Sequence, residues 1–146
     1  MKRILFLFLI SGVVGCNSEI EIPLKVSKNF WYKYENATQT EWILESDIYT
    51  VTFTLNNFPK TSSYKKNGEW INTISPLPPR RSMICVRDFV DERYATLRIK
   101  EVVFVETATS EKYFVTLGGL AEDEDQGSES VVLEFNADCE FVRVGN

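Results

Sequence analysis

Histidine is absent from this chain of 146 residues, and cysteine occurs only three times. Without histidine the chain cannot form a Ser-His-Asp or Cys-His catalytic arrangement, and it lacks the most common ligand of transition metals. A glycine-rich phosphate-binding loop is also missing. Chemistry by carboxylates or lysines stays open. The absences therefore favour a binding protein over an enzyme, with no metal and no cofactor expected.

Long apolar runs are confined to the N-terminus. Lys2 and Arg3 precede an unbroken apolar run over residues 4–10. The run is shorter than the ~20 residues that a membrane-spanning helix needs, and its basic start is typical of a secretion signal. It leads into Val13-Val14-Gly15-Cys16, which resembles the lipobox of bacterial lipoprotein precursors.

The lipobox resemblance implies that Cys16 receives a diacylglycerol and that a peptidase cuts the chain before it. Residues 1–15 would then be the signal peptide, residues 16–19 a lipidated tether, and residues 20–146 a single domain. Two or three acyl chains hold a protein firmly on a membrane. Asn17 replaces the aspartate that directs some lipoproteins to the inner membrane, so we expect an anchor in the outer membrane that faces the periplasm.

Positive charge is scarce in the expected mature protein. Removal of residues 1–15 leaves 14 basic and 21 acidic residues, a net charge of 14 − 21 = −7. Such an acidic chain is a poor ligand for nucleic acid, and a protein partner with a basic surface is the more natural expectation, although acidity also favours solubility. The densest acidic stretch comprises Glu122, Asp123, Glu124 and Asp125. Its spacing does not fit a calcium loop, so it is either a solvated loop or a docking patch for the basic partner.

Two cysteines remain once Cys16 is assigned to the lipid. Cys85 and Cys139 form an even pair in a compartment that promotes oxidation. A disulfide between them would close a loop of about 54 residues and contribute about 4 kcal/mol to stability. We therefore predict that these two residues are bonded, with two free buried thiols as the alternative.

Alternation of apolar and polar residues dominates the rest of the sequence, and no internal repeat is visible. Residues 49–55 have apolar side chains on one face and threonines on the other, which is typical of a half-buried antiparallel strand. Residues 20–26 alternate in the same way, with Pro23 favouring a sheet edge. Further strands are expected at residues 29–34, 41–45, 82–87, 93–99, 101–106, 112–117, 130–135 and 139–144.

These strands are separated by residues that favour turns, at positions 56–57, 67–68, 118–119 and 136–138. The last two strands are expected to form a hairpin, and the apolar register shifts near Lys100-Glu101, which indicates a bulge or a break. Many short strands at this spacing predict an all-β antiparallel β-sandwich, immunoglobulin-like in outline, with a small barrel as the alternative.

A proline-rich segment at residues 75–81 ends in two arginines. Its tandem prolines impose an extended conformation, Arg80 and Arg81 offer forked hydrogen-bond donors, and Trp70 lies just upstream. This mixture suits a protein interface. A rigid connection between strands, with arginines that pair with the protein's own acids, is the favoured alternative.

The lipobox at Cys16, the short tether and the small β domain with its Trp70 to Cys85 stretch together resemble the type VI secretion immunity lipoproteins. The resemblance implies a lipid-anchored periplasmic protein that binds and neutralises a secreted toxin without catalysis. The alternative is a structural or assembly lipoprotein of the envelope that binds another membrane component.

Overall fold

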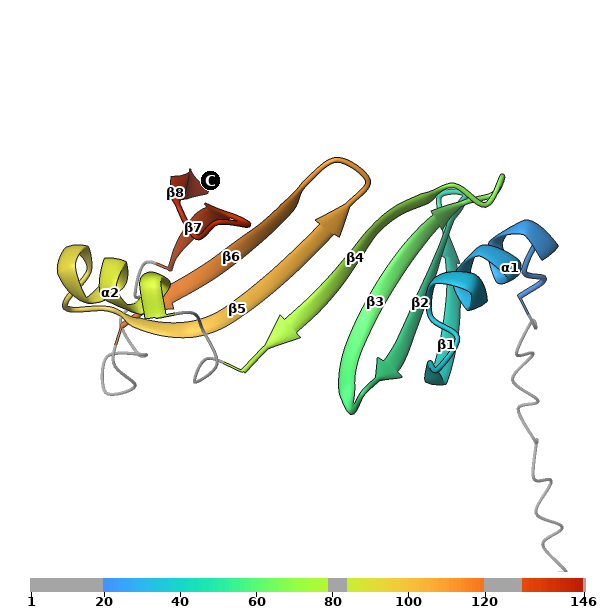
Figure 1. Cartoon of the computed structure of the whole chain (residues 1–146), viewed down its shortest axis with the longest axis horizontal. Helices are drawn as coiled ribbons and strands as arrows, with labels where there is room; N and C mark the ends of the chain where they lie inside the picture. The colour runs from blue at the N-terminus through green and yellow to red at the C-terminus, as the bar shows by residue number, and fades with distance from the viewer. Residues whose placement is uncertain (1–19, 79–83, 120–129, 146) are drawn as a thin grey trace, which may run out of the picture.

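The computed structural model describes residues 20–78, 84–119 and 130–145, which form two helices and eight strands (Figure 1). The N-terminal half of the described chain contains one helix and four strands: α1 (Leu24–Lys33), β1 (Thr38–Glu45), β2 (Ile48–Leu55), β3 (Phe58–Lys65) and β4 (Trp70–Leu77). The C-terminal half repeats this order: α2 (Ile84–Arg93), β5 (Arg98–Thr107), β6 (Glu111–Gly118), β7 (Val131–Asn136) and β8 (Phe141–Gly145).

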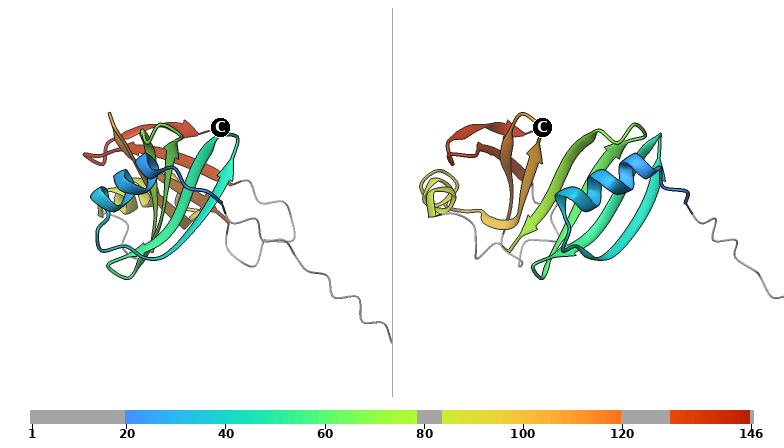
Figure 2. Two further views of the ribbon diagram at one scale, coloured as in Figure 1. Left: turned by 90° about the vertical axis from the view of Figure 1, so that its right-hand side faces the viewer. Right: turned by 45° about the vertical axis from the view of Figure 1, so that its right-hand side comes forward.

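All eight strands form one antiparallel sheet in which each strand pairs with its neighbour in sequence. The predicted all-β, sandwich-like fold is confirmed in its antiparallel strands and its layered core. The second layer, however, consists of the two helices and not of a second sheet, so the immunoglobulin-like strand order does not apply. Figure 2 shows α1 lying across the strands of the first half.

Short turns explain why consecutive strands pair. The residues between β2 and β3, Asn56 and Asn57, have φ of 52° and 66°, as two-residue hairpins require, so the predicted turn is confirmed. At the turn between β3 and β4, Gly68 has a φ of 90°. A Cβ there would lie 3.0 Å from atoms of Lys25 and Asn29. Glycine therefore allows this turn to approach α1, where the Asn29 amide donates to the Gly68 carbonyl at 2.8 Å.

The strands expected at residues 20–26, 29–34 and 82–87 are wrong, because these segments contribute to α1 and α2. In α1, Val26 and Phe30 are four residues apart and both are completely buried. Val86 and Val90 have the same spacing in α2 and are also buried. Side chains at this spacing share one face of a helix, so each short helix buries one apolar stripe against the sheet.

Most other expected strands are confirmed within one to three residues at their ends, including the final β7–β8 hairpin. The expected strand at 93–99 is wrong for its first residues, because β5 begins at Arg98. The register shift near Lys100-Glu101 is confirmed as an irregularity between Ile99 and Glu101. Two strands, β3 and β4, were not expected at all. Their serines, threonines and prolines hide the alternation that identifies a strand from sequence.

The chain contains a structural repeat, which corrects the expectation of none. Each helix ends in the same way: the Tyr34 and Tyr94 amides donate to the carbonyls of Phe30 and Val90, four residues earlier. The equivalent core positions are sixty residues apart: Val26 and Val86, Phe30 and Val90, Tyr34 and Tyr94, and Ala37 and Leu97. Because most of the paired residues differ in type, the two halves repeat in structure but not clearly in amino-acid sequence.

Each half has its own core between its helix and the shared sheet. Aromatic residues dominate the first core, which contains Phe30, Tyr34, Tyr49, Phe53 and Tyr64. The second core is mainly aliphatic and contains Val86, Val90, Val102, Val115, Leu117 and Leu133, with Phe135. The register of the ladders places both cores on the same face of the sheet. The opposite face, which no described helix covers, is called the helix-free face below.

Candidate protein-binding surface

The predicted lipidation site and several residues predicted to bind a partner lie outside the described residues. They are Cys16, the acidic residues Glu122, Asp123, Glu124 and Asp125, and the arginines Arg80 and Arg81. Their roles stay predictions. Among the helices that the structure does describe, none is long and apolar enough to cross a membrane.

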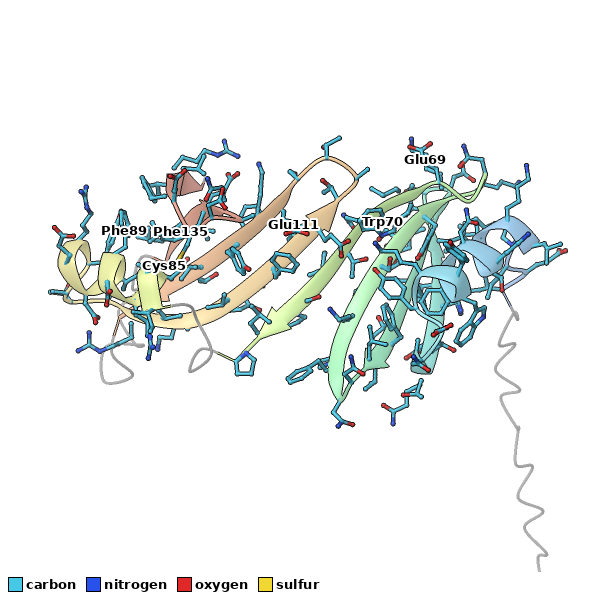
Figure 3. The ribbon with its side chains drawn as sticks, in the orientation of Figure 1. Glu69, Trp70, Cys85, Phe89, Glu111 and Phe135 are labelled. Carbon is cyan, nitrogen blue, oxygen red and sulfur yellow. A yellow bond between two sulfur atoms is a disulfide. The ribbon has the colours of Figure 1, made fainter. Side chains whose placement is uncertain are left out.

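The predicted disulfide between Cys85 and Cys139 is confirmed. It joins the first turn of α2 to the turn that precedes β8, with 6.4 Å between the two Cα atoms. Figure 3 shows Cys85 on the same side of the sheet as Phe89 and Phe135, near the second core. Phe89 stacks on Phe141 with ring centroids 4.7 Å apart. The disulfide therefore fixes α2 over the last hairpin of the sheet.

Trp70 lies at the start of β4, where it is half-buried against the first core. Its indole N–H donates to the hydroxyl oxygens of Ser62 and Thr73, at 3.1 and 3.0 Å. The Lys33 ammonium lies 3.9 Å from the centre of the Trp70 ring and 2.9 Å from a carboxylate oxygen of Glu106. Trp70 thus contacts α1 and β3, and Lys33 extends this network to Glu106 of β5 in the second half, so Trp70 has a structural role more than that of an exposed anchor.

Buried tyrosines complete this network. The Tyr34 hydroxyl and the Thr73 hydroxyl are hydrogen-bonded, and burial raises the pKa of Tyr34. Burial also raises the pKa of Tyr64 to about 12. Both phenols therefore stay neutral at physiological pH, so neither is suited to act as a base or a nucleophile.

In the first half, hydroxyl groups line the helix-free face of β2 and β3, while Ile43 of β1, opposite Thr50, is an exposed apolar side chain on the same face. Thr50 and Thr52 of β2 are opposite Ser63 and Thr61 of β3, and the paired hydroxyls lie 3.2 and 3.5 Å apart. Such cross-strand pairs suit a sheet surface that faces water.

In the second half, the same face is apolar. Since side chains alternate along a strand, Val103, Val105 and Phe114 point away from the core residues Val102 and Val115. Ile74 is the cross-strand partner of Val105, and Val132 lies between two core-facing residues of β7. We call these five residues, Ile74, Val103, Val105, Phe114 and Val132, the apolar patch. Each is only partly buried, and none belongs to either core.

A charged cluster borders the apolar patch. Phe114 of β6 is opposite Glu134 of β7, and Glu134 is opposite Arg143 of β8. The Glu134 carboxylate accepts hydrogen bonds from the ammonium of Lys112 and from Nε of Arg143, both at 2.6 Å. Only 1% of the Glu134 side chain is exposed, although Lys112 and Arg143 are themselves exposed. The carboxylate is therefore covered by its cationic partners and not by a core.

The hydrogen bonds from Lys112 and Arg143 lower the pKa of Glu134. Glu134 is consequently ionised throughout the neutral range, and its charge is balanced on the face that carries the apolar patch. No group of three or more histidines, cysteines or acids in the described part of the chain is arranged to hold a metal ion.

The apolar patch was not identified from the sequence, although a signal was present. Residues 102–105, Val-Val-Phe-Val, form a continuous apolar run inside a strand. A strand with apolar residues on both faces indicates that both faces are covered, by the protein itself or by a partner. The sequence interpretation predicted the strand at residues 101–106 but drew no conclusion from its two apolar faces.

Comparison with known proteins identifies the fold. No family model matches the chain, and no curated protein sequence is similar to it. A DUF2874 family protein from Bacteroides ovatus has a similar structure, with a TM-score of 0.73 and 21% identity over 88% of this chain and 89% of that chain. A BLIP-like protein from Bacteroides fragilis aligns with a TM-score of 0.72 and 17% identity, over 88% of each chain.

A protein from Bacteroides eggerthii that is described as periplasmic aligns with a TM-score of 0.69 and 15% identity, over 86% of this chain and 89% of that chain. The alignments include both halves of the sheet because they cover most of each chain. At these identities the similarity establishes the shared fold and not a shared function.

Proposed function

We propose that this chain is a non-catalytic binding protein of the bacterial envelope, anchored by lipid at Cys16, that engages a protein partner through the apolar patch on its helix-free face. The single observation that carries this proposal is the apolar patch itself. A contiguous apolar surface on a solvent-facing sheet is typical of an interaction site, and the hydroxyl groups on the first half of the same face provide the contrast.

The aromatic residue of the patch supports a protein partner in particular. Phe114 is the largest side chain of the patch and lies between Val103 on β5 and Glu134 on β7. Aromatic residues surrounded by smaller apolar and charged groups are enriched at the centres of protein interfaces. The Lys112–Glu134–Arg143 cluster at the rim contains two cations and one carboxylate, a net charge of +1, and would contact a neutral or acidic part of the partner surface.

Charge distribution supports a partner with a basic surface. Residues 84–146 contain 6 basic and 14 acidic residues, a net charge of −8, whereas residues 20–83 contain 8 basic and 6 acidic residues, a net charge of +2. The negative charge thus accumulates in the half that carries most of the apolar patch. Opposite charges chiefly accelerate association, and the apolar contact then determines how long the complex lasts.

The envelope location rests on the signal peptide and lipobox, and it agrees with the structural neighbour that is described as periplasmic. Within the envelope, neutralisation of a secreted toxin remains our first proposal for the partner's identity. An assembly role that involves another membrane component is the alternative. Deletion of the gene distinguishes the two roles. Killing of the deletion strain by neighbouring wild-type cells indicates immunity, and a weakened envelope indicates assembly.

Site-specific photo-crosslinking tests the proposed surface. A photoreactive residue at position 114 should capture the partner in living cells, and the same residue at position 52 is the matched control on the polar half of the same face. Circular dichroism establishes that both variants fold. Equal capture from both positions, or capture from position 52 alone, would contradict the proposal. Catalytic turnover by the purified domain would contradict the non-catalytic function.

The acidic residues outside the described part of the chain provide a second test. Neutralisation of Glu122, Asp123, Glu124 and Asp125 to Gln or Asn should slow association with the captured partner about tenfold at low salt, with little effect on dissociation. Stopped-flow or surface plasmon resonance at two salt concentrations measures both rates. If neither salt nor the four substitutions changed the association rate, the acidic stretch would have no role in recognition.

A further inference from the structure

The sheet splits at one point, between β3 and β4. The paired residues of these two strands run from Thr61 and Ile74 to Tyr64 and Trp70. Both strands nevertheless extend further: β3 begins at Phe58 and stays paired with β2, while β4 continues to Leu77 and stays paired with β5. Figure 1 shows β3 and β4 diverging at this end.

Two prolines explain the split. Continuation of the register from Thr61 and Ile74 would place Pro59 directly opposite Pro76. Neither proline has an N–H to donate, so this pair cannot contribute a hydrogen bond to the ladder. The two strands therefore separate below Thr61 and follow their other neighbours.

The split opens a cavity of about 310 Å³ beside the strand ends. Its apolar walls are formed by Leu55, Phe58, Leu77 and Pro78, and its polar groups include Lys60 and Ser75. Lys60 and Ser75 have the same orientation as the buried residues Ser62 and Thr73, so they face the helix side of the sheet. The cavity is thus on the opposite face from the apolar patch, and it is independent of the proposed protein interface.

Lys60 gives the cavity an unbalanced positive charge. Its ammonium donates to the Ser75 hydroxyl at 2.8 Å, and Ser75 is only 5% exposed. No carboxylate of the described ranges 20–78, 84–119 and 130–145 forms an ion pair with Lys60. A cation beside apolar walls, held by a neutral hydroxyl, is an incomplete site that favours an anion.

We propose that this cavity binds an apolar carboxylate. The carboxylate accepts a hydrogen bond from the Lys60 ammonium, and the hydrocarbon part of the ligand lies against Leu55, Phe58 and Leu77. The volume is at the lower end of the range of small-molecule sites, which suits a medium-chain fatty acid or the apolar C-terminal residue of a peptide. Both ligands present the same chemistry, a single carboxylate attached to an aliphatic group.

The test uses octanoate as the probe and isothermal titration calorimetry as the readout, on the domain from residue 17 with its disulfide intact. Octylamine and octanol are the charge-reversed and neutral comparisons. Lys60→Met should weaken octanoate binding about tenfold or more, because it removes a charged hydrogen-bond donor. Lys66→Met is the matched control, because Lys66 is exposed in the turn between β3 and β4, and it should leave binding unchanged.

Amide and methyl chemical shifts localise the ligand, with the largest changes expected at Leu55 and Leu77. A leucine-terminated dipeptide with a free or an amidated C-terminus identifies the source of the carboxylate. Octanoate binding alone indicates a lipid acid, and binding of the free-acid dipeptide alone indicates a peptide terminus. No binding of either acid, equal binding of octanol and octanoate, or unchanged octanoate binding by a folded Lys60→Met variant would overturn the proposal.

Discussion

The two halves of the molecule share one architecture and stabilise it by different means. In the first half, Phe30 of α1 contacts the rings of Trp42, Phe53 and Tyr64 at centroid distances of 5.3, 5.1 and 6.4 Å. In the second half, Val90 occupies the equivalent helical position among aliphatic residues, and the disulfide adds a covalent connection to the sheet. A helix on a four-stranded sheet therefore requires a filled volume and a correct polar pattern, and it does not require particular residues.

The halves differ again on the helix-free face. The first half presents threonine and serine pairs there, and the second presents the apolar patch with the Lys112–Glu134–Arg143 cluster. The helix-free face contributes to neither core, so folding does not require its two halves to differ in polarity. We interpret it as specialisation: the first half maintains a soluble surface, and the second half carries the surface for recognition.

Removal of the disulfide is expected to have the largest effect on this comparison. The double variant Cys85→Ser, Cys139→Ser should lose about 4 kcal/mol of unfolding free energy, because the bond closes a long loop in the unfolded chain. Urea denaturation measures the loss, and hydrogen exchange should show that α2 opens more than α1. A loss below about 1 kcal/mol would mean that the second core is sufficient by itself. A reducing agent should lower the unfolding free energy of the wild type and leave that of the variant unchanged.

An exchange of the two equivalent helix residues comes next. Phe30→Val should cost about 2–3 kcal/mol because it leaves a cavity among aromatic rings, and Val90→Phe should cost about 1–3 kcal/mol by overpacking the aliphatic core. Since the two sites belong to separate cores, the costs should add in the double variant. Thermal denaturation of the four proteins provides the measurement. A double variant as stable as the wild type would show that the two cores are interchangeable.

Loss of the Glu134 cluster in the second half is expected to have a smaller effect. Glu134→Gln should cost about 1–2 kcal/mol at neutral pH, since it removes two charge-assisted hydrogen bonds. Because the pKa of Glu134 is lower in the folded state, its contribution is present above the pKa of an unfolded glutamate and is lost as the pH falls below it. The stability difference between wild type and variant should therefore shrink with acidification.

The exposed pair of Lys65 and Glu69 is the control for Glu134 in the first half. Hydrogen bonding and the charge of Lys65 lower the pKa of Glu69, but both side chains are half-exposed to solvent. Glu69→Gln should therefore leave stability unchanged within the error of the measurement. Equal effects of the two substitutions, at any pH, would show that coverage by cationic side chains adds nothing to the Glu134 pairing.

Sequence reasoning was most successful where a local pattern has one physical interpretation. Alternation identified β2, the asparagine pair identified the turn after it, and the shifted register near Lys100 identified an irregularity in β5. It failed for α1 and α2, whose apolar residues at i and i+4 are few and lie next to alternating segments. Ten-residue helices with two buried residues each carry too weak a periodicity to compete with that alternation.

The sequence by itself determined the acidic balance and the tendency to form antiparallel strands, and the count of cysteines was enough to predict the Cys85–Cys139 disulfide. The signal peptide and the lipid at Cys16 stay predictions from the sequence. Only the tertiary structure decided which segments meet. One continuous sheet, the repeat of two halves, the apolar patch and the split between Pro59 and Pro76 all depend on the register between strands. Register is set by the fit of many side chains at once, and no local segment contains that information.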